Sequence, residues 1–180
     1  MADVRPEKRA AWLKVGIDVL STSGPGALTL DELTARMGLT KGSFYHHFKD
    51  REGFVSALLE HWEQQMTHRL IEQAEAGGTT RDKQRRLTHL AMTLYGSKLE
   101  LNIRAWARNS PLVRRSVKRV DQARIAYLAN IARDITGDPK RAMQLAEIAY
   151  AVFVGAQQVV PPVEREDLLK LYGELNRLYV

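Results

Sequence analysis

The run TLDELTARMGLTKGSFYHHF, residues 29–48, predicts two short helices joined by a tight turn. Thr29 and Glu32 stand at the spacing of a capping box, in which a hydroxyl and a carboxylate each accept an N–H left unpaired at a helix start. Gly38 follows a short apolar stripe, where a left-handed residue closes a helix. Thr40 is then placed to cap a second helix. This order of elements is a helix-turn-helix.

The second helix has an inward and an outward face. Phe44 and Phe48 lie four residues apart, so we expect both in the core. The outward positions carry donors, cations and flat rings: Lys41, Ser43, Tyr45, His46 and His47. In a helix-turn-helix of this kind the second helix fits the major groove of DNA. The alternative is a plain helical hairpin inside a bundle, and spacing alone leaves both open.

The residues themselves resemble a known family. The segment LTLDELTARMGLTKGSFYHHFKDREGFVSALLEHW is similar to the N-terminal domain of TetR-like transcriptional regulators, and the resemblance covers about residues 5–65. It implies that the following residues lie at or near DNA: Thr29, Thr40, Lys41, Gly42, Ser43, Tyr45, His46, His47 and Lys49. It further implies a regulator, expected to be a repressor, that binds a palindromic operator as a homodimer and is released by a small-molecule effector.

Side-chain chemistry separates these residues into two groups. Some are suited to phosphate contacts, which position a protein without reading sequence: Thr29, Tyr45, His47 and Lys49. Others are candidates for base edges, since lysine donates to guanine and serine serves either partner: Lys41, Ser43 and His46. Gly42 would let the start of the helix approach the duplex closely. The alternative at each position is a solvent-exposed side chain on a structural hairpin.

Composition limits the class of protein. The absence of cysteine excludes disulfides and thiolate metal sites. The N-terminus lacks the apolar core of a signal peptide, and the longest uncharged apolar run, near residues 148–163, is broken by two prolines. We therefore expect a soluble, cytoplasmic protein without a membrane span.

Charge is unevenly distributed along the chain. The net charge is +6, and residues 81–119 alone hold 11 basic and 2 acidic side chains. This segment lies outside the predicted DNA reader. In the reader itself, the positions of the basic residues rather than their number support DNA contact, because Arg5, Lys8 and Arg9 begin the chain. The basic segment either binds an anion or is a solvated helix face, and the sequence leaves both open.

The chain as a whole predicts an all-α fold of about nine helices. We expect a DNA-binding domain over residues 1–50 and an effector-binding and dimerisation domain over residues 51–180. Outside the helix-turn-helix, helices are expected over residues 6–22, from 50 to the glycines at 77–78, and over 81–97, 101–108, 111–136, 139–159 and 166–179.

The last two helices suggest a partner. Residues 139–159 are apolar nearly all round from Ala142 onward, which predicts a helix buried on every side. Together with residues 166–179 they offer more apolar surface than one small domain covers. A homodimer would bury both helices against their copies in a four-helix interface. The alternative is that the intramolecular core absorbs them.

An effector pocket follows only from the resemblance, and its expected lining residues are Met66, His89, Met92, Tyr95, Trp106, Tyr127, Phe153 and Gln157. Packing in the core is the alternative for each. We expect no catalytic site, cofactor or metal: no glutamate precedes a histidine by three residues as a di-iron bundle requires, and adjacent His46 and His47 point about 100° apart on a helix. A DNA-compacting protein of low specificity is a further alternative, although the reader lacks its dense lysine and arginine.

Overall fold

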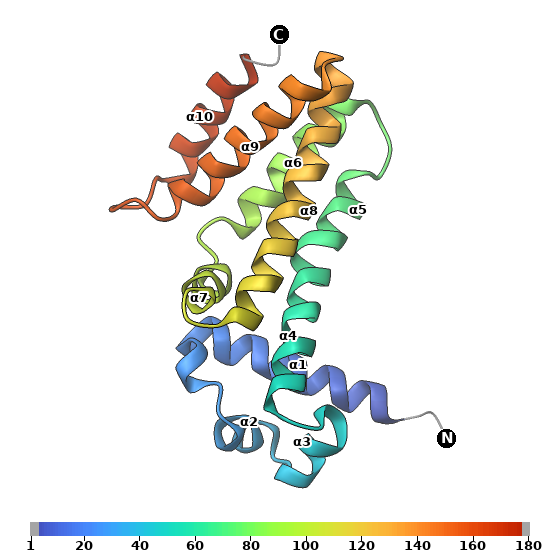
Figure 1. The fold of residues 1–180 in the computed structure, drawn as a ribbon, viewed down its shortest axis with the longest axis vertical. Coiled ribbons are helices and arrows are strands. Elements are labelled where there is room, and N and C mark those ends of the chain that lie inside the picture. The colour runs from blue at the N-terminus through green and yellow to red at the C-terminus, as the bar shows by residue number, and fades with distance from the viewer. Residues whose placement is uncertain (1–3, 178–180) are drawn as a thin grey trace. The chain divides into compact units, whose positions relative to one another are not determined.

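A computed structural model describes the backbone of residues 4–177 and the side chains of residues 7–177. This part of the chain is helical throughout and contains no strand (Figure 1). Nine α-helices result when α4, η2 and α5 are counted as one continuous helix, so the predicted all-α class and helix number are confirmed. Tyr179, expected in the last helix, and the side chain of Arg5 lie outside the described residues. The elements are α1 (Val4–Ser23), the 3-10 turn η1 (Pro25–Ala27), α2 (Leu30–Met37), α3 (Lys41–Phe48), α4 (Arg51–Glu63), the π-helix η2 (Gln64–His68), α5 (Arg69–Ala74), α6 (Thr80–Leu94), α7 (Lys98–Ala107), α8 (Pro111–Thr136), α9 (Pro139–Ala156) and α10 (Arg165–Arg177).

The described residues form two compact units. Unit 1 contains the chain up to Met66 together with Ser97–Lys118, and unit 2 contains Thr67–Gly96 together with the chain from Arg119 onward. The division expected after residue 50 does not coincide with these units, because α4 and α7 both pack on α1. The predicted helix-turn-helix therefore shares its core with α4 and α7, which come later in the chain.

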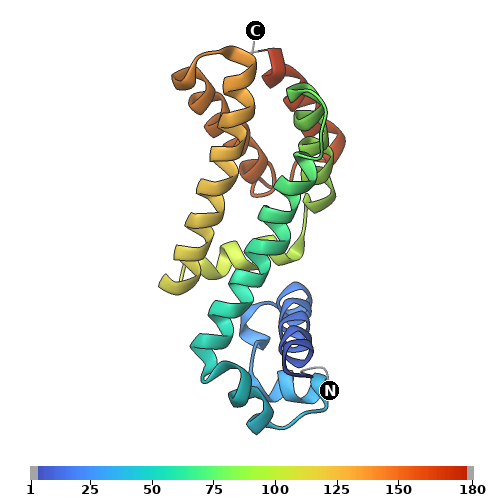
Figure 2. The same cartoon turned by 90° about the vertical axis from the view of Figure 1, so that its right-hand side faces the viewer.

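Aromatic side chains form the centre of unit 1, where α1 packs against α2, α3, α4 and α7 (Figure 2). Trp12 is completely buried and meets Phe44 edge-on at a centroid distance of 5.5 Å. The ring centroid of Phe54 lies 5.1 Å from that of Phe44 and 4.9 Å from that of Phe48. Edge-to-face and tilted ring pairs of this kind contribute about 0.5–1.5 kcal/mol each beyond the area they bury. Phe44 and Phe48 are buried as predicted, and they hold α3 against α1 and α4.

Gly16 marks the closest approach of α1 to α4. A Cβ built at this position would lie 2.8 Å from Cζ of Phe54 and 2.9 Å from Cδ1 of Leu58, which is shorter than van der Waals contact. A glycine inside a helix costs about 1 kcal/mol relative to alanine. Here the close packing of the two helices accounts for that cost.

Two separate apolar clusters hold unit 2 together. In the first, Ala74, Tyr127 and Ile131 join α5, α6 and α8 with the help of partly buried side chains from all three helices. In the second, Met92 and Leu168 connect α6 and α10 with α9. Helices α9 and α10 lie side by side (Figure 1).

Helix boundaries differ from the prediction around α6. The helix expected over residues 81–97 runs from Thr80 to Leu94, and the next begins at Lys98 rather than at residue 101. A full capping box between Thr79 and Asp82 sets the start, and Gly96 at φ +77° lies in the break that follows. The glycine pair before this capping box predicts a break but does not fix where the next helix begins. Helix α9 likewise ends at Ala156, earlier than the expected residue 159.

The prediction that residues 139–159 are buried on every side is wrong for the single chain. Ala142, Leu145 and Ala146 are buried, but Met143 is 43% exposed and Ile148 is 44% exposed. The apolar surface of α9 exceeds what the neighbouring helices of unit 2 cover. No helix among the described residues is long and apolar enough to cross a membrane.

Candidate nucleic-acid interface

Helix α2 begins at a capped turn. Oγ1 of Thr29 accepts a hydrogen bond from the N–H of Glu32 at 3.2 Å, as predicted. The predicted return hydrogen bond, from the N–H of Thr29 to the carboxylate of Glu32, is wrong, because this N–H donates to the carbonyl of Ala27 at 2.7 Å. The carboxylate of Glu32 instead accepts from Nε of Arg36 at 2.6 Å. Because Arg36 lies four residues after Glu32 on the same face of α2, the two form an ion pair, and the carboxylate does not cap the helix.

A left-handed residue and a second cap lead into α3. Gly38 has φ +62°, and its N–H reaches the carbonyls of Thr34 and Ala35. Oγ1 of Thr40 then accepts from the N–H of Ser43 at 3.4 Å. A hydroxyl that accepts at a cap still has its own hydrogen to donate. The caps of α2 and α3 can therefore also donate to phosphate, next to helix N-termini that favour anions.

The outer face of α3 presents polar side chains over an aromatic core. Tyr45 is 50% exposed between the buried Phe44 and Phe48. Most of the residues expected at DNA are exposed, namely Thr29, Thr40, Lys41, Gly42, Tyr45, His46 and Lys49, and two are half-buried, namely Ser43 and His47. The structure thus brings the whole predicted set together on α3, its cap and the start of α2 (Figure 1).

Within the chain, Gly42 has room for a side chain. The nearest neighbour of a Cβ built there is Oγ1 of Thr40 at 3.7 Å, which is ordinary contact. The fold of unit 1 therefore does not require glycine at this position. A glycine here is instead explained if a ligand approaches the first turn of α3 closely, as the sequence predicts for DNA at Gly42.

An ion pair between α2 and α3 was not predicted. Nζ of Lys41 lies 2.6 Å from Oδ1 of Asp31. The hydrogen bond to Asp31, followed by its negative charge, raises the pKa of Lys41 above its ordinary value. From the sequence, Asp31 is recognised only as an acid in the first turn of a helix. Nothing in that pattern predicts that it pairs with Lys41, ten residues later.

Two cations of α1 lie beside α3. The pKa of His47 is held below its ordinary value, first by burial and then by the positive charges of His46, Lys8 and Arg9. The guanidinium of Arg9 also lies 5.5 Å from the ring centroid of Phe48, within cation–π range. The start of α1 therefore extends the positive outer face of α3, as the placement of these residues in the sequence suggested.

The turn after α3 has an unusual backbone. Lys49 has φ +63° and ψ −54°, and the N–H of Asp50 donates to the carbonyl of Phe48 at 2.6 Å. This is the geometry of a γ-turn, which is rare and strained for a residue with a side chain. Oδ1 of Asp50 caps α4 by accepting from the N–H of Gly53 at 2.7 Å. A Cβ at Gly53 would lie 2.4 Å from the Phe48 carbonyl oxygen, so only glycine fits there. The cap and the glycine together hold Lys49 at the exposed end of α3.

The residues expected to line an effector pocket are divided between the two units. Met66 and Trp106 belong to unit 1, and the others belong to unit 2. Tyr127 lies in the first apolar cluster of unit 2, where its hydroxyl donates to Oε1 of Glu75 at 2.8 Å. Burial, followed by Glu75, raises the pKa of Tyr127 well above its ordinary value. His89 is exposed on α6.

Three of the expected effector residues, Met92, Tyr95 and Phe153, belong to the second cluster of unit 2, and a fourth, Gln157, is hydrogen-bonded to the backbone of Phe153. Tyr95 packs against Phe153 at a centroid distance of 5.8 Å, and both flank Met92. The side-chain amide of Gln157 accepts from the N–H of Gly96 at 3.1 Å and donates to the carbonyl of Phe153 at 3.0 Å. These two contacts give both the oxygen and the nitrogen of the Gln157 amide a partner within the chain.

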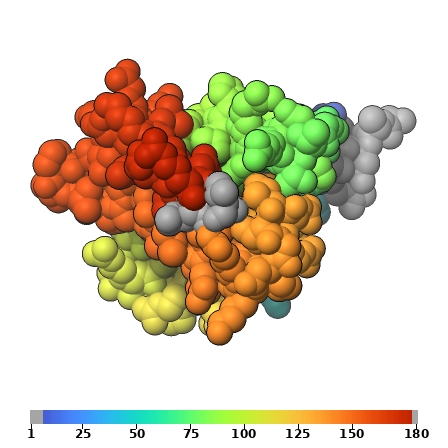
Figure 3. All heavy atoms as spheres, turned by 90° about the horizontal axis from the view of Figure 1, so that it is seen from above, coloured from blue at the N-terminus to red at the C-terminus, as the bar shows by residue number. Residues whose placement is uncertain are grey.

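A cavity opens between α6 and α10. Its volume is about 360 Å³, and it is lined by Arg81, Gln84, Arg85, Thr88, His89, Met92, Leu169 and Asn176. Nε2 of Gln84 donates to Oδ1 of Asn176 at 3.0 Å, and Figure 3 shows α10 on the surface of unit 2 beside the green segment that includes α6. Of the expected effector residues, His89 and Met92 line this cavity.

Cations of the basic segment find acceptors inside the chain. Lys83 pairs with Glu75, and Arg86 donates to the carbonyls of Ala74 and Gly77 near the end of α5. In unit 1, Nη2 of Arg104 lies 3.0 Å from Oε1 of the buried Glu100. These partners favour a structural use of the segment's charge. Among the described residues there is also no group of three or more histidines and acids that could hold a metal ion.

The N-terminal part of the chain matches known regulators. Residues 13–58 match the family model of the bacterial regulatory proteins of the tetR family. The chain is 32% identical over 56 residues to the HTH-type transcriptional regulator YerO of Bacillus subtilis, covering 31% of this chain and 19% of YerO. It is 31% identical over 72 residues to the HTH-type transcriptional repressor Rv3405c of Mycobacterium tuberculosis, covering 40% of this chain and 38% of that protein. The matched segments thus span less than half of these relatives.

Solved structures resemble nearly the full length of the chain. E. coli NemR in its reduced form aligns with a TM-score of 0.71 at 23% identity, over 95% of this chain and 93% of NemR. A TetR transcriptional regulator from Legionella pneumophila aligns with a TM-score of 0.71 at 15% identity, over 99% of this chain and 96% of that one. At these identities the likeness establishes the fold. Residues 13–58 of this chain are therefore the N-terminal helix-turn-helix domain of the tetR family of bacterial regulatory proteins, and the chain has the TetR-like fold.

Proposed function

We propose that this protein is a sequence-specific transcriptional regulator, and in particular a repressor that binds a palindromic operator as a homodimer. The observation that carries the proposal is the outer face of α3. Polar and cationic side chains cover it, while Phe44 and Phe48 beneath it anchor the helix in unit 1. A rigid helix that presents donors at its first turns is what major-groove reading requires. Repression is supported by the relative that is named a repressor.

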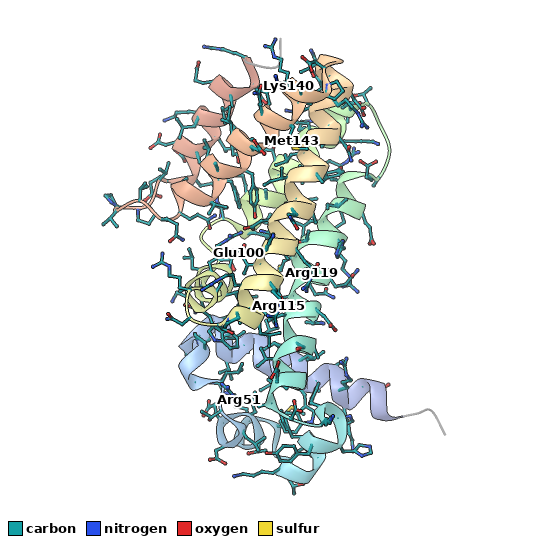
Figure 4. The ribbon with its side chains drawn as sticks, viewed as in Figure 1. Arg51, Glu100, Arg115, Arg119, Lys140 and Met143 are labelled. Atoms are coloured by element: carbon teal, nitrogen blue, oxygen red, sulfur yellow. The ribbon has the colours of Figure 1, made fainter. Side chains whose placement is uncertain are left out.

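Apolar side chains exposed on α9 and α10 support the homodimer. Met143, labelled in Figure 4, and Ile148 project from α9 at 43% and 44% exposure, and Leu171 of α10 is 45% exposed. Exposed apolar surface on neighbouring helices indicates a protein interface. A two-fold axis through these helices would place two readers on the two half-sites of an inverted repeat.

Effector control is the third part of the proposal. A small molecule bound in unit 2 would release the protein from its operator by binding one shape of the dimer better than the other, because a ligand with equal affinity for both shifts nothing. Residues 51–180, with the second apolar cluster of unit 2 and the cavity between α6 and α10, contain the candidate places.

The experiment is selection of bound sequences from a random duplex pool at near-physiological salt, with unlabelled competitor DNA present. Competitor removes electrostatic binding and leaves specific binding. We expect an inverted repeat, which reports both sequence reading and two-fold symmetry. A matched control is the variant Ser43→Ala/His46→Ala, which removes two predicted base contacts and keeps the formal charge and the buried rings. Recovery of no motif by the folded wild-type protein would overturn the proposal.

A further inference from the structure

The cavity between α6 and α10 has a polar end and an apolar end. At the polar end, Nε2 of Gln84 donates to Oδ1 of Asn176 at 3.0 Å. At the other end, Met92 of α6 is buried in a cluster with Leu168 of α10, and Leu169 lines the cavity beside them. Residue numbers rise along α6 and fall along α10 between these contacts, so the helices are antiparallel. With a rise of about 1.5 Å per residue, the two ends lie roughly 12 Å apart.

The cations of α6 differ in whether the chain supplies them with an acceptor. Three of them pair or donate within the chain, namely Lys83, Arg85 and Arg86. Arg81 has neither a hydrogen bond nor an ion pair among the described residues, and it lines the cavity from the first turn of α6. The adjacent acid, Asp82, already pairs with Arg85 and closes the capping box of the helix. The α6 wall of the cavity therefore carries a cation that lacks a counter-charge from the chain.

The size and chemistry of the cavity indicate the class of molecule that fits it. Its volume of about 360 Å³ is within the range of small-molecule sites, about 300–1,000 Å³. Guanidinium groups bind carboxylates through paired, charge-assisted hydrogen bonds. The flexible thioether of Met92 adapts to apolar groups of different shape. Arg81 and Leu169 are exposed, so a ligand reaches both ends from solvent. Together these features select a carboxylate that carries an apolar chain or ring.

We propose that the cavity between α6 and α10 binds an amphipathic carboxylate, whose anionic group is bound by Arg81 and Arg85 and whose apolar part packs on Met92 and Leu169. The ligand lies against α10, one of the two helices of the proposed dimer interface, so its binding favours one dimer shape over another. This effect on the dimer rests on the proposed function, whereas binding itself can be measured without DNA.

The first test is equilibrium dialysis of the full chain against radiolabelled octanoate, below its micellar concentration. Octanoate combines charge and chain, acetate keeps only the charge, and octanol keeps only the chain. We expect saturable binding of one octanoate per chain and competition by hexanoate and decanoate. Acetate and octanol should compete at least about tenfold more weakly, because each lacks one of the two interactions.

Two variants at exposed positions of the cavity locate the bound octanoate. Arg81→Gln should weaken binding about fivefold, because it removes the cation that has no partner in the chain. Leu169→Asp should weaken it about tenfold or more, because it replaces apolar surface with a charge that repels the ligand. The matched control is Arg133→Gln, which changes the same charge at an exposed position of α8 outside the cavity and should bind octanoate like the wild type. Thermal melting of each variant checks that it is folded.

The second test measures the effect on DNA by fluorescence anisotropy with the selected operator. Octanoate should weaken operator binding by the wild type about fivefold or more, the usual lower range of coupling between two sites. In Leu169→Asp protein the same concentration should leave operator affinity unchanged. An operator affinity that octanoate does not change in the wild type would overturn the effect on the dimer.

Three results would overturn the ligand site while leaving operator recognition intact. One is folded wild-type protein that binds none of the carboxylates saturably. Another is octanol competing as well as unlabelled octanoate, which would mean that the cavity selects apolar molecules regardless of charge. The third is unchanged octanoate affinity in both Arg81→Gln and Leu169→Asp, which would place the ligand elsewhere. Failure to select any operator would instead overturn the proposed function, and octanoate binding in dialysis would not depend on it.

Discussion

The α3 outer face in unit 1 and the α9–α10 pair in unit 2 leave opposite kinds of side chain exposed. On α3 the aromatic residues are buried and polar groups such as Tyr45, His46 and Lys49 face solvent. On α9 and α10 the apolar side chains Ile148 and Leu171 are nearly half exposed. The first surface is complete within the chain and suits a charged, hydrated ligand. The second is incomplete and suits another protein surface, so exposure distinguishes the two roles where helical periodicity does not.

Gly53→Ala should give the largest effect and would break the first of these surfaces. The new Cβ would lie 2.4 Å from a backbone oxygen that cannot move without shifting the turn after α3. We expect a loss of about 3 kcal/mol in the free energy of unfolding, measured by urea titration.

A matched glycine in the second region should respond in the opposite direction. Gly173 is inside α10, and a Cβ added there would have no atom within 4 Å, so Gly173→Ala should stabilise the protein by about 0.5–1 kcal/mol. Equal effects of the two substitutions would contradict the close packing described for the turn.

Ile148→Glu tests the second surface. If α9 is at a homodimer interface, a buried carboxylate there should weaken dimerisation by about 2 kcal/mol or more, roughly thirtyfold, as measured by sedimentation equilibrium. Lys140→Glu, a polar position on the same helix labelled in Figure 4, is the control and should stay dimeric. A wild-type protein that sediments as a monomer would show that the exposed apolar side chains have another partner.

Lys41→Ala should reduce operator affinity by about 1–3 kcal/mol if Lys41 donates to a base, and the loss should depend on the operator base beneath it. Anisotropy titrations on operators altered one base pair at a time provide the measurement. A loss of the same size on every sequence would make Lys41 a phosphate contact.

Substitutions of Lys49 separate binding from stability at the end of α3. Lys49→Ala should lower affinity for operator and unrelated DNA alike, by about 1 kcal/mol, because a phosphate contact carries no sequence information. Lys49→Gly should lose the same affinity but raise the free energy of unfolding by about 1 kcal/mol, since φ +63° strains a residue with a Cβ. Unchanged affinity in both variants would remove Lys49 from the interface.

The smallest effects concern pH, and they should occur in different ranges in the two units. The folded-state pKa of His47 lies below its ordinary 6.5, so the unfolded chain binds this proton first, and unit 1 should lose stability as the pH falls below about 6.5. In unit 2, hydrogen bonds from Lys83 and Tyr127 lower the pKa of Glu75 below 4.5, so its contribution is complete above 4.5 and is lost as the pH falls through the lower folded-state value. Urea titrations across this range, with His47→Gln and Glu75→Gln as controls, measure both; a His47→Gln protein with an unchanged slope near pH 6.5 would assign that slope to another group.

Helix starts were well predicted where the signal is local. Thr40 caps α3 as predicted, and Asp50 and Asp138 cap α4 and α9 at the residues where those helices were expected to begin. The exception is Glu32, which binds Arg36 rather than closing the box with Thr29. The sequence contains two local patterns that could use the Glu32 carboxylate, the capping box with Thr29 and the i,i+4 ion pair with Arg36, and the ion pair forms.

Residues brought together from distant parts of the chain were not predictable in this way. The expected effector residues are divided between two units, and within unit 2 Tyr127 lies in a different apolar cluster from Met92, Tyr95 and Phe153. The pairing of Asp31 with Lys41 and the contact of Gly16 with Phe54 depend on the crossing of helices, which no spacing rule within one helix specifies.

The sequence by itself determined the helical class, most helix starts and the polar face of α3, because caps and helical periodicity act over about four residues. It also supplied the family resemblance of the reader. Only the tertiary structure decided which apolar side chains of α9 stay exposed, how Lys49 is held in a γ-turn, and which carboxylate holds Lys41. Those outcomes depend on the packing of one helix against another, and packing is set by contacts between residues far apart in the chain.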